Sequence, residues 1–292
     1  MRKILTSFVA AAVLGSSLAY ATVKSSAQVS KESVIQAKKD AKNLEVSLIK
    51  EAVQSLALTQ KVLIDISKKD IKSAIKDLED AIGKLEVILA SKKAPKLLPV
   101  DNKIFAIEYV GDINTLKKAV EKVKTLVNEG KLQDARVLLN TLQSQINVIT
   151  TYIPLATYPD ALKLAAKYLH ENKINEAATV LDTALNTLVQ EETIIPIPIV
   201  KAEALINAAS KVAKKDKKQA LAHLEVAKKE LELAKALGYV SKSDTTYKNL
   251  NDAIEAIEKE IKGKNKAEKL FEDLLKKIKD FKEKIVDAAS KK

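Results

Sequence analysis

Hydrophobic and polar residues alternate along most of the chain with the spacing of amphipathic helices. Between positions 34 and 65, apolar residues recur every seven residues in two seams, which are interrupted at Glu51, Ser55 and Asp65. Because a coiled coil needs unbroken seams, this stretch predicts one long packed helix over residues 34–65. The next apolar series predicts a second helix over residues 70–90.

Two short stretches depart from the helical spacing. Residues 104–110 (IFAIEYV) and 146–152 (INVITTY) are rich in β-branched and aromatic residues, which favour strands. Each is the obvious partner of the other, so we expect a small two-stranded β-ribbon. The alternative for 146–152 is that it only ends the preceding helix. Residues 92–103, with two prolines, are expected to form a connector.

Helical hairpins recur from residue 113 onwards. In NEGKLQDARVLLNTL and ENKINEAATVLDTAL, a turn residue, Gly130 or Asn172, is followed five positions later by an alanine. Glycine and asparagine can end a helix in the left-handed conformation, and a small alanine lets the next helix pack closely. The spacing between turns is too irregular for a solenoid. The fold class is therefore mainly α, an irregular multi-helix bundle of helical hairpins with a small β-ribbon.

Two proline steps interrupt the helices, in residues 149–166 and 193–206. The first step contains Pro154 and Pro159, and the second contains Pro196 and Pro198. Residues before proline favour extended backbone, and proline suits the first helical position, so each step should end one element and begin a helix, at about Asp160 and Ile199. The surrounding isoleucines are too apolar for a solvent loop. We therefore expect all four prolines to be structural, with both steps buried and in contact.

The order of these segments resembles the YfdX family. The resemblance rests on LLPVDNKIFAIEYV, GKLQDARVLLNTLQSQINVITTYIPLATYPDAL, NEAATVLDTALNTLVQEETIIPIPIVKAEAL and LELAKALGY, and it spans residues 45–262. It implies an exported, mainly helical, often self-associating protein linked to bacterial stress responses, especially to acid, with no settled molecular activity. We expect a YfdX-like helical domain over residues 22–262. Residues 263–292 depart from the family pattern and predict a lysine-rich amphipathic C-terminal helix.

The first 21 residues have the pattern of a secretory signal peptide. Arg2 and Lys3 precede an apolar run, and the small-x-small triplet Ala19-Tyr20-Ala21 follows it. An uncleaved anchor is the alternative, but a spanning helix needs about 20 apolar residues and this run is about 15. We expect cleavage after Ala21 and a periplasmic location. Since the chain has no cysteine, the exported protein must rely on core burial instead of disulfides.

The strong positive charge does not indicate a nucleic-acid partner. The formal charge of +12 falls to +10 without Arg2 and Lys3, and Arg136 is then the only arginine. Nucleic-acid recognition favours the bidentate guanidinium and aromatic stacking, whereas the aromatics here are not interleaved with basic residues. Lysines that alternate with glutamates are typical of solvated helix faces. We expect no nucleic acid among the partners.

No catalytic or metal-binding pattern is present in the sequence. The two histidines, His170 and His223, lie far apart and lack further ligands at metal-site spacing. Neither a Gly-x-Ser-x-Gly elbow nor a glycine-rich phosphate loop occurs. We therefore predict a protein that is not an enzyme and has no metal site or cofactor.

Four residues are candidates for ligand binding. Arg136 could offer its planar fork to an anionic group, and a structural ion pair is the alternative. Tyr109, Tyr152 and Tyr158 could line a pocket beside the ribbon and the proline steps. The alternative for the tyrosines is an ordinary place in a core or a subunit interface.

These features predict a binding or chaperone-like stress protein. It would take a small ligand or a client protein through apolar and tyrosine-bearing surface and associate into a homo-oligomer. The alternative function is that of a structural or scaffolding protein. In it, the long N-terminal helix and the amphipathic C-terminal helix mediate oligomers or lie on an anionic membrane surface.

Overall fold

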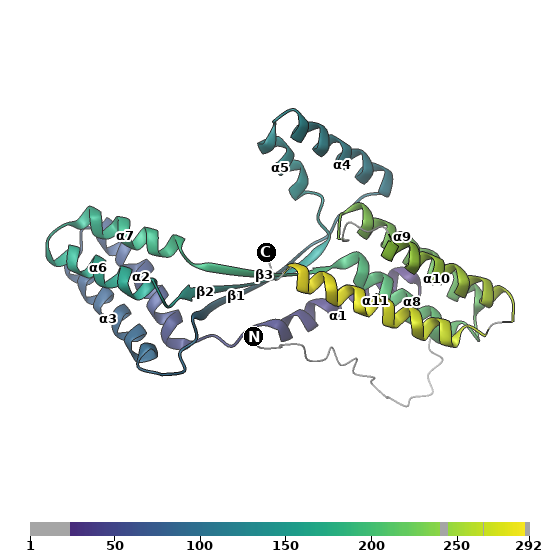
Figure 1. Ribbon diagram of the computed structural model, residues 1–292, viewed down its shortest axis with the longest axis horizontal. Helices are drawn as coiled ribbons and strands as arrows, with labels where there is room; N and C mark the ends of the chain where they lie inside the picture. Colours follow the sequence, from purple (N-terminus) through teal and green to yellow (C-terminus); the bar gives the residue numbers. More distant parts are fainter. Residues whose placement is uncertain (1–23, 240–244, 265, 290–292) are drawn as a thin grey trace. The chain divides into compact units, whose positions relative to one another are not determined.

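The computed structural model describes residues 24–239, 245–264 and 266–289 (Figure 1). The expected signal peptide, residues 1–21, lies outside them. The fold is mainly α with a small antiparallel sheet, as predicted. The α-helices are α1 (Ser26–Ala41), α2 (Lys50–Ser67), α3 (Ile71–Leu89), α4 (Ile113–Asn128), α5 (Leu132–Asn140), α6 (Tyr158–His170), α7 (Ile174–Asn186), α8 (Ile197–Val212), α9 (Lys217–Ala236), α10 (Thr245–Lys262) and α11 (Glu268–Ala289). The strands are β1 (Leu97–Ile107), β2 (Gln145–Pro154) and β3 (Val189–Pro196).

The chain folds into two compact units, each assembled from separate stretches of sequence. Unit 1 comprises the described residues of Met1–Asn43, Phe105–Ile146 and Ile194–Lys292, and unit 2 comprises Leu44–Ile104 and Asn147–Thr193. Each unit has its own hydrophobic core.

The predicted ribbon is confirmed, but the sheet is larger than expected. The strand order is β1-β2-β3, so β1 and β3 are the edges. β1 begins at Leu97, within the segment expected to be a connector, and it contains Pro99. Proline is tolerated there because an edge strand does not need every N–H for the ladder. The Pro99 carbonyl instead accepts a hydrogen bond from the Ile49 N–H at 3.0 Å.

The prediction of one long helix over residues 34–65 is wrong. α1 ends at Ala41, a short 3₁₀ turn (Lys42–Leu44) follows, and α2 begins only at Lys50. The backbone between α1 and α2 is bonded to β1, where Asn102 Nδ2 donates to the Val46 carbonyl at 2.8 Å. The heptad-like spacing was therefore carried by two helices that belong to different units.

Unit 2 is built from two helical hairpins, α2–α3 and α6–α7. The turn residues Lys69 and Asn172 both have positive φ, the left-handed conformation expected at Asn172. The helix predicted from Asp70 is confirmed as α3, with the Asp70 side chain accepting the Ser73 N–H at its N-terminus. The core of this unit includes Leu78, Leu85, Tyr158, Leu162, Leu169 and Leu181.

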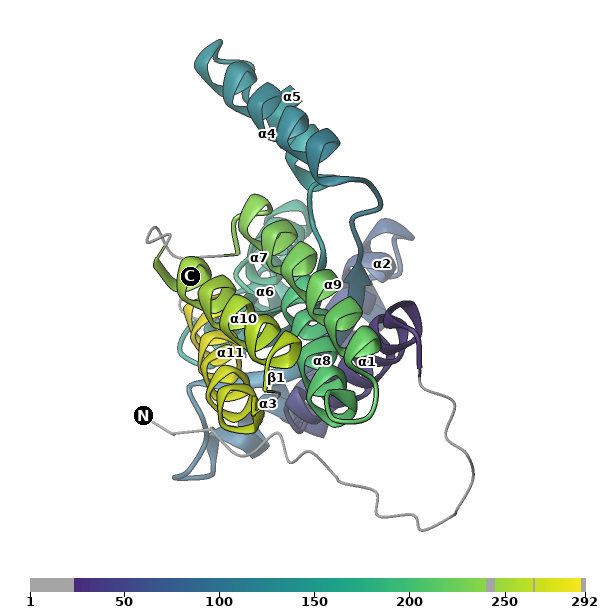
Figure 2. The same cartoon turned by 90° about the vertical axis from the view of Figure 1, so that its right-hand side faces the viewer.

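Unit 1 contains a bundle of α1 and α8 to α11, shown side by side in Figure 2. The lysine-rich C-terminal segment contains the helix α11. It packs against α8 and α10. Its buried residues are Phe271, Leu274, Ile278 and Phe281. The Lys282 ammonium also pairs with Glu203 of α8.

The proline steps are sheltered from solvent. Pro159, Pro196 and Pro198 are buried, and Pro154 is half-buried. Each step begins a helix, because Pro159 lies in the first turn of α6 and Pro198 in the first turn of α8. The first step belongs to unit 2, whereas Pro196 and Pro198 belong to unit 1. The two steps are therefore sheltered in different units.

Candidate functional site

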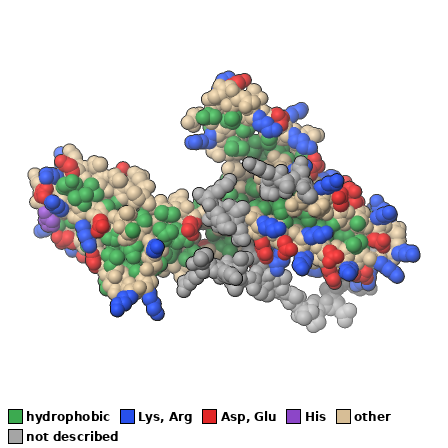
Figure 3. All heavy atoms as spheres, in the orientation of Figure 1, with side chains coloured by type: hydrophobic (Ala, Val, Ile, Leu, Met, Phe, Trp, Pro, Cys, Tyr) green, Lys and Arg blue, Asp and Glu red, His purple; other side chains and the backbone are tan. Residues whose placement is uncertain are grey.

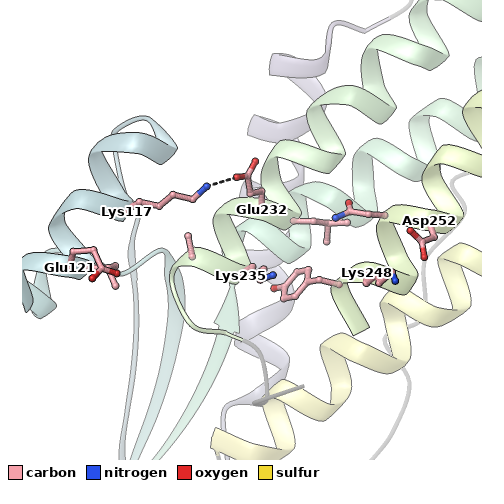
Figure 4. Close-up of a pocket in the computed structure, with 11 residues that line it drawn as sticks. Lys117, Glu121, Glu232, Lys235, Lys248 and Asp252 are labelled. Atoms are coloured by element: carbon pink, nitrogen blue, oxygen red, sulfur yellow. Dashed lines mark hydrogen bonds and ion pairs between the residues drawn. The ribbon is translucent and has the colours of Figure 1, made fainter. Parts of the chain in front are cut away.

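A cleft of about 900 Å³ lies in unit 1 between α4, α9 and α10 (Figure 4). Its volume is in the range of small-molecule sites, roughly 300–1,000 Å³. Its apolar wall is formed by Val120, Leu231, Ala236 and the ring of Tyr247. Its charged rim is formed by Lys117, Glu121, Glu232, Lys235, Lys248 and Asp252. Three lysines and three carboxylates give the rim no net charge.

One helix cap begins α4, and one ion pair joins it to α9. The Asp112 side chain accepts the N–H groups of Asn114 and Thr115 at 2.8 and 2.9 Å and so fixes the start of α4. The hydrogen bonds from Thr115 lower the pKa of Asp112, so this cap stays ionised. Lys117 then reaches across to Glu232, with 2.8 Å between Nζ and Oε1 (Figure 4).

Tyr247 supplies the aromatic part of the cleft wall. Its side chain is 2% exposed, and its ring packs edge-on against Phe281, with 5.6 Å between ring centroids. Burial raises the pKa of the phenol, so the hydroxyl remains protonated. Neither Tyr247 Oη nor Asn251 Oδ1, one turn later on α10, has a hydrogen-bond partner within the described chain. Leaving such a buried group unpaired costs about 1–3 kcal/mol.

A second hollow, of about 550 Å³, follows the same seam between α9 and α10. It shares Glu232 and Asn251 with the first cleft. Lys228 in this hollow pairs with Glu255 at 3.2 Å. The α9–α10 seam is therefore hollowed on both sides of Asn251.

The structure does not bring the four predicted ligand-binding residues together. Arg136 is exposed on α5. Tyr109 follows β1 in unit 1, where its hydroxyl donates to the Asp112 carbonyl at 3.4 Å. Neither residue lines the cleft.

Tyr152 and Tyr158 belong to unit 2. Tyr152 is buried on β2, and burial together with Glu191 raises its pKa to about 12. Tyr158 is fully buried at the start of α6, where burial raises its pKa to about 12. The side chain of Tyr158 is therefore part of the core of this unit, as the alternative interpretation held.

Sequence reasoning missed the residues that form the cleft. Lys117 and Glu232 are separated by 115 positions, and no local pattern links them. A partial signal was available, because Tyr247 and Asn251 lie four positions apart in the sequence and so place a phenol and an amide one helical turn apart.

The described part of the chain lacks two further features. No cluster of three or more histidine, cysteine or acidic side chains could hold a metal ion there. Within the same residues, no helix has the length and hydrophobicity needed to cross a bilayer.

Residues 55–194 match the family model described as YfdX protein. A comparison with curated proteins gives no significant match. Among solved structures, YfdX of Salmonella Typhi is similar with 16% sequence identity and a TM-score of 0.35, over 51% of this chain and 93% of that one. The matched region includes α4, whereas α9 and α10 lie beyond it. Through residues 55–194, the chain belongs to the YfdX family.

Proposed function

We propose that the chain is an exported, non-enzymatic stress-response protein that binds a small ligand or client protein in the cleft of unit 1. The observation that supports binding is the cleft itself, which joins an apolar, tyrosine-bearing wall to a charged rim. The unpaired Tyr247 Oη and Asn251 Oδ1 add to this support. A bound molecule that reached them after a side-chain movement would remove the cost of leaving them unpaired.

The chemistry of the cleft favours binding over catalysis. Its lining residues include no histidine, serine or cysteine, and Glu232 is held in an ion pair with Lys117. A serine–histidine contact exists elsewhere, between Ser26 and His223. The other nitrogen of that imidazole contacts Gln219 instead of a carboxylate. This arrangement lacks the acidic group that orients the base in a hydrolase triad.

Export and a role in stress form part of the same proposal. The signal-peptide pattern of residues 1–21 supports export, and the family supplies the link to stress. Fractionation of cells that make the full chain, with N-terminal sequencing of the product, tests this point. A product that retains Met1 in the cytoplasm would contradict export.

A compound screen with a matched pair of variants tests binding. The melting temperature of the mature protein is measured with each compound at neutral and acid pH. A compound at 100 times its Kd stabilises the folded state by about 2.7 kcal/mol. Ala236→Phe fills the cleft, whereas Val87→Phe places the same ring on an exposed site in unit 2. Compounds should stabilise the wild type and Val87→Phe but not Ala236→Phe; equal effects on all three would contradict the cleft as the site.

The scaffolding alternative gains no support from α11. Its apolar residues Phe271, Leu274, Ile278 and Phe281 are buried inside unit 1 and so are not available to a membrane. Homo-oligomer formation remains part of the proposal and is measured by light scattering over a range of concentrations.

A further inference from the structure

Three helical hairpins of the chain close with the same turn. Lys69, Gly130 and Asn172 have φ values of 62°, 72° and 59°. The backbone hydrogen bonds also match. In one turn, the N–H groups of Gly130 and Lys131 donate to the carbonyls of Val127 and Leu126. In another, the N–H groups of Asn172 and Lys173 donate to the carbonyls of Leu169 and Tyr168. The α4–α5 hairpin thus aligns with the α6–α7 hairpin, each residue of the first corresponding to the residue 42 positions later.

In unit 2, the apolar face of α6–α7 is covered by another hairpin. α3 packs on α6, and α2 packs on α7. As a result, Leu169 is only 3% exposed and Leu181 is fully buried. The α2–α3 hairpin supplies Leu78 and Leu85 to the same core.

The equivalent face of α4–α5 is open. Val127 corresponds to Leu169 and is 48% exposed, and Leu139 corresponds to Leu181 and is 52% exposed. The buried residues of this hairpin are Leu116, in the first turn of α4, and the small Ala135 of α5. We call the remaining apolar positions of this face the open stripe; they are Val120, Val123, Val127, Leu132 and Leu139. Because Val120 also lines the cleft, the stripe and the cleft are continuous.

The charge around the open stripe is positive. Residues 113–140 carry six basic side chains and three acidic ones. The basic residues are Lys117, Lys118, Lys122, Lys124, Lys131 and Arg136, and the acidic ones are Glu121, Glu129 and Asp134. Figure 3 shows apolar side chains among lysines on this hairpin. The same hairpin of a second copy would bring the same excess of positive charge, whereas an acidic partner would complement it.

We propose that the open stripe and the cleft together seat an acidic amphipathic helix of a partner protein, which packs on α4 as α3 packs on α6. The proposal rests on the proposed function and deepens it, since the helix is the client bound at the cleft. An amphipathic helix presents anchors at the i, i+3, i+4 and i+7 positions, which fit an apolar groove between helices. The lysines beside the stripe then meet the acidic face of the helix.

The probe is a peptide taken from the chain itself. Residues 71–89 form α3, whose apolar face fits the α6–α7 hairpin. Replacing Lys72, Lys76 and Lys84 by glutamate keeps that face and leaves the peptide with seven carboxylates and no lysine. The peptide with the natural charges is the matched control. Binding of each labelled peptide to the mature protein is measured by fluorescence anisotropy at low and high salt.

The acidic peptide should bind saturably and at least about tenfold more tightly than the control peptide, with a difference that shrinks in high salt. Val127→Ser with Leu139→Ser should weaken binding at least about tenfold, because it removes two anchors. Ile64→Ser with Val87→Ser alters two exposed apolar residues of unit 2 instead and should leave binding unchanged. Circular dichroism confirms that both double variants are folded.

Other results would overturn the proposal. Equal binding to both double variants, or no binding of the acidic peptide, would exclude the open stripe as its seat. Light scattering in which the wild type associates and Val127→Ser with Leu139→Ser does not would show that a second copy covers the stripe. If compounds stabilise the wild type but not Ala236→Phe while the acidic peptide fails to bind, this inference fails and the proposed function stands. If neither compounds nor the peptide bind, both fail.

Discussion

Ser26 Oγ lies 2.9 Å from His223 Nδ1, which ties α1 to α9 inside unit 1. The other imidazole nitrogen lies 3.2 Å from Gln219 Nε2, and the same amide nitrogen donates to the Lys24 carbonyl. With the amide donating, the neutral ring accepts at Nε2 and donates at Nδ1. Burial lowers the pKa of His223 below its usual 6.5, although Asp216 opposes this shift.

This contact predicts that unit 1 loses stability in mild acid. Because the pKa of His223 is lower in the folded state, the unfolded chain binds more protons as the pH falls. The stabilising contribution of the neutral His223 side chain is present above about pH 6.5 and is lost progressively below it. In His223→Gln, the melting temperature should fall less between pH 7.5 and 5 than in the wild type. His170→Gln, on the surface of unit 2, is the control; an unchanged slope in His223→Gln would contradict the prediction.

Glu230 should affect the pH dependence of stability in the opposite direction to His223. Its carboxylate on α9 lies 3.7 Å from Lys201 Nζ, which also pairs with Glu108 at 2.6 Å. Burial raises the pKa of Glu230 above its usual 4.5 despite Lys201. The folded state therefore holds this proton more tightly, and its stability falls as the pH rises through 4.5. Glu230→Gln should raise the melting temperature at pH 7 but not at pH 4. The exposed Glu225→Gln is the control, and a lower melting temperature for Glu230→Gln at pH 7 would refute the argument.

Local sequence patterns predicted the helices better than their assembly. The turns at Gly130 and Asn172, the strands near residues 104 and 146 and the helix α11 depend on neighbouring residues, and they could be found by periodicity and turn chemistry. The third strand, β3, could not, because its residues needed β2 as a partner to form a strand instead of a loop. The break after Ala41 was hidden because the seven-residue spacing continued across it.

The candidate site was harder to predict, for a physical reason. Its wall combines Val120, Leu231 and Tyr247 from three helices that are distant in sequence. The residue types that drew attention were tyrosines near prolines, and Tyr158 shows why this signal failed: a large aromatic side chain next to a helix start is favoured in a core by its apolar area. Tyr158 is therefore buried in the core of unit 2.

Gly130 provides a test of the shared hairpin turn. Its φ of 72° is unfavourable for most side chains, although a Cβ there would meet no atom within 4 Å. The strain of the backbone is therefore the only cost. Gly130→Asn should change the free energy of unfolding by less than about 1 kcal/mol, because asparagine tolerates this conformation, as Asn172 does. Gly130→Val should cost about 1–2 kcal/mol more. Chemical denaturation measures both, and equal values would argue against a strained turn.

The core of unit 2 should tolerate the loss of the Tyr158 hydroxyl. Its hydroxyl has no hydrogen-bond partner within the described residues, and the nearby Thr59 hydroxyl donates to the Ser55 carbonyl instead. Tyr158→Phe keeps the ring and removes the unpaired group, so the free energy of unfolding should be unchanged or rise by about 1 kcal/mol. Tyr158→Ala should lower it by about 3–5 kcal/mol through loss of packing. A loss above about 1 kcal/mol in Tyr158→Phe would show that the hydroxyl is paired.

Removal of residues 263–292 separates a core role of α11 from a role on membranes. Phe281 packs on the Tyr247 ring, and Phe271, Leu274 and Ile278 are buried in the same core. The truncated protein should therefore expose apolar surface, bind a hydrophobic dye and melt at a lower temperature. Lys276→Glu with Lys277→Glu changes only the exposed basic face of α11 and should melt as the wild type does. If this charge variant abolished flotation of the protein with anionic liposomes while its fold stayed intact, α11 would act on membranes as well as in the core.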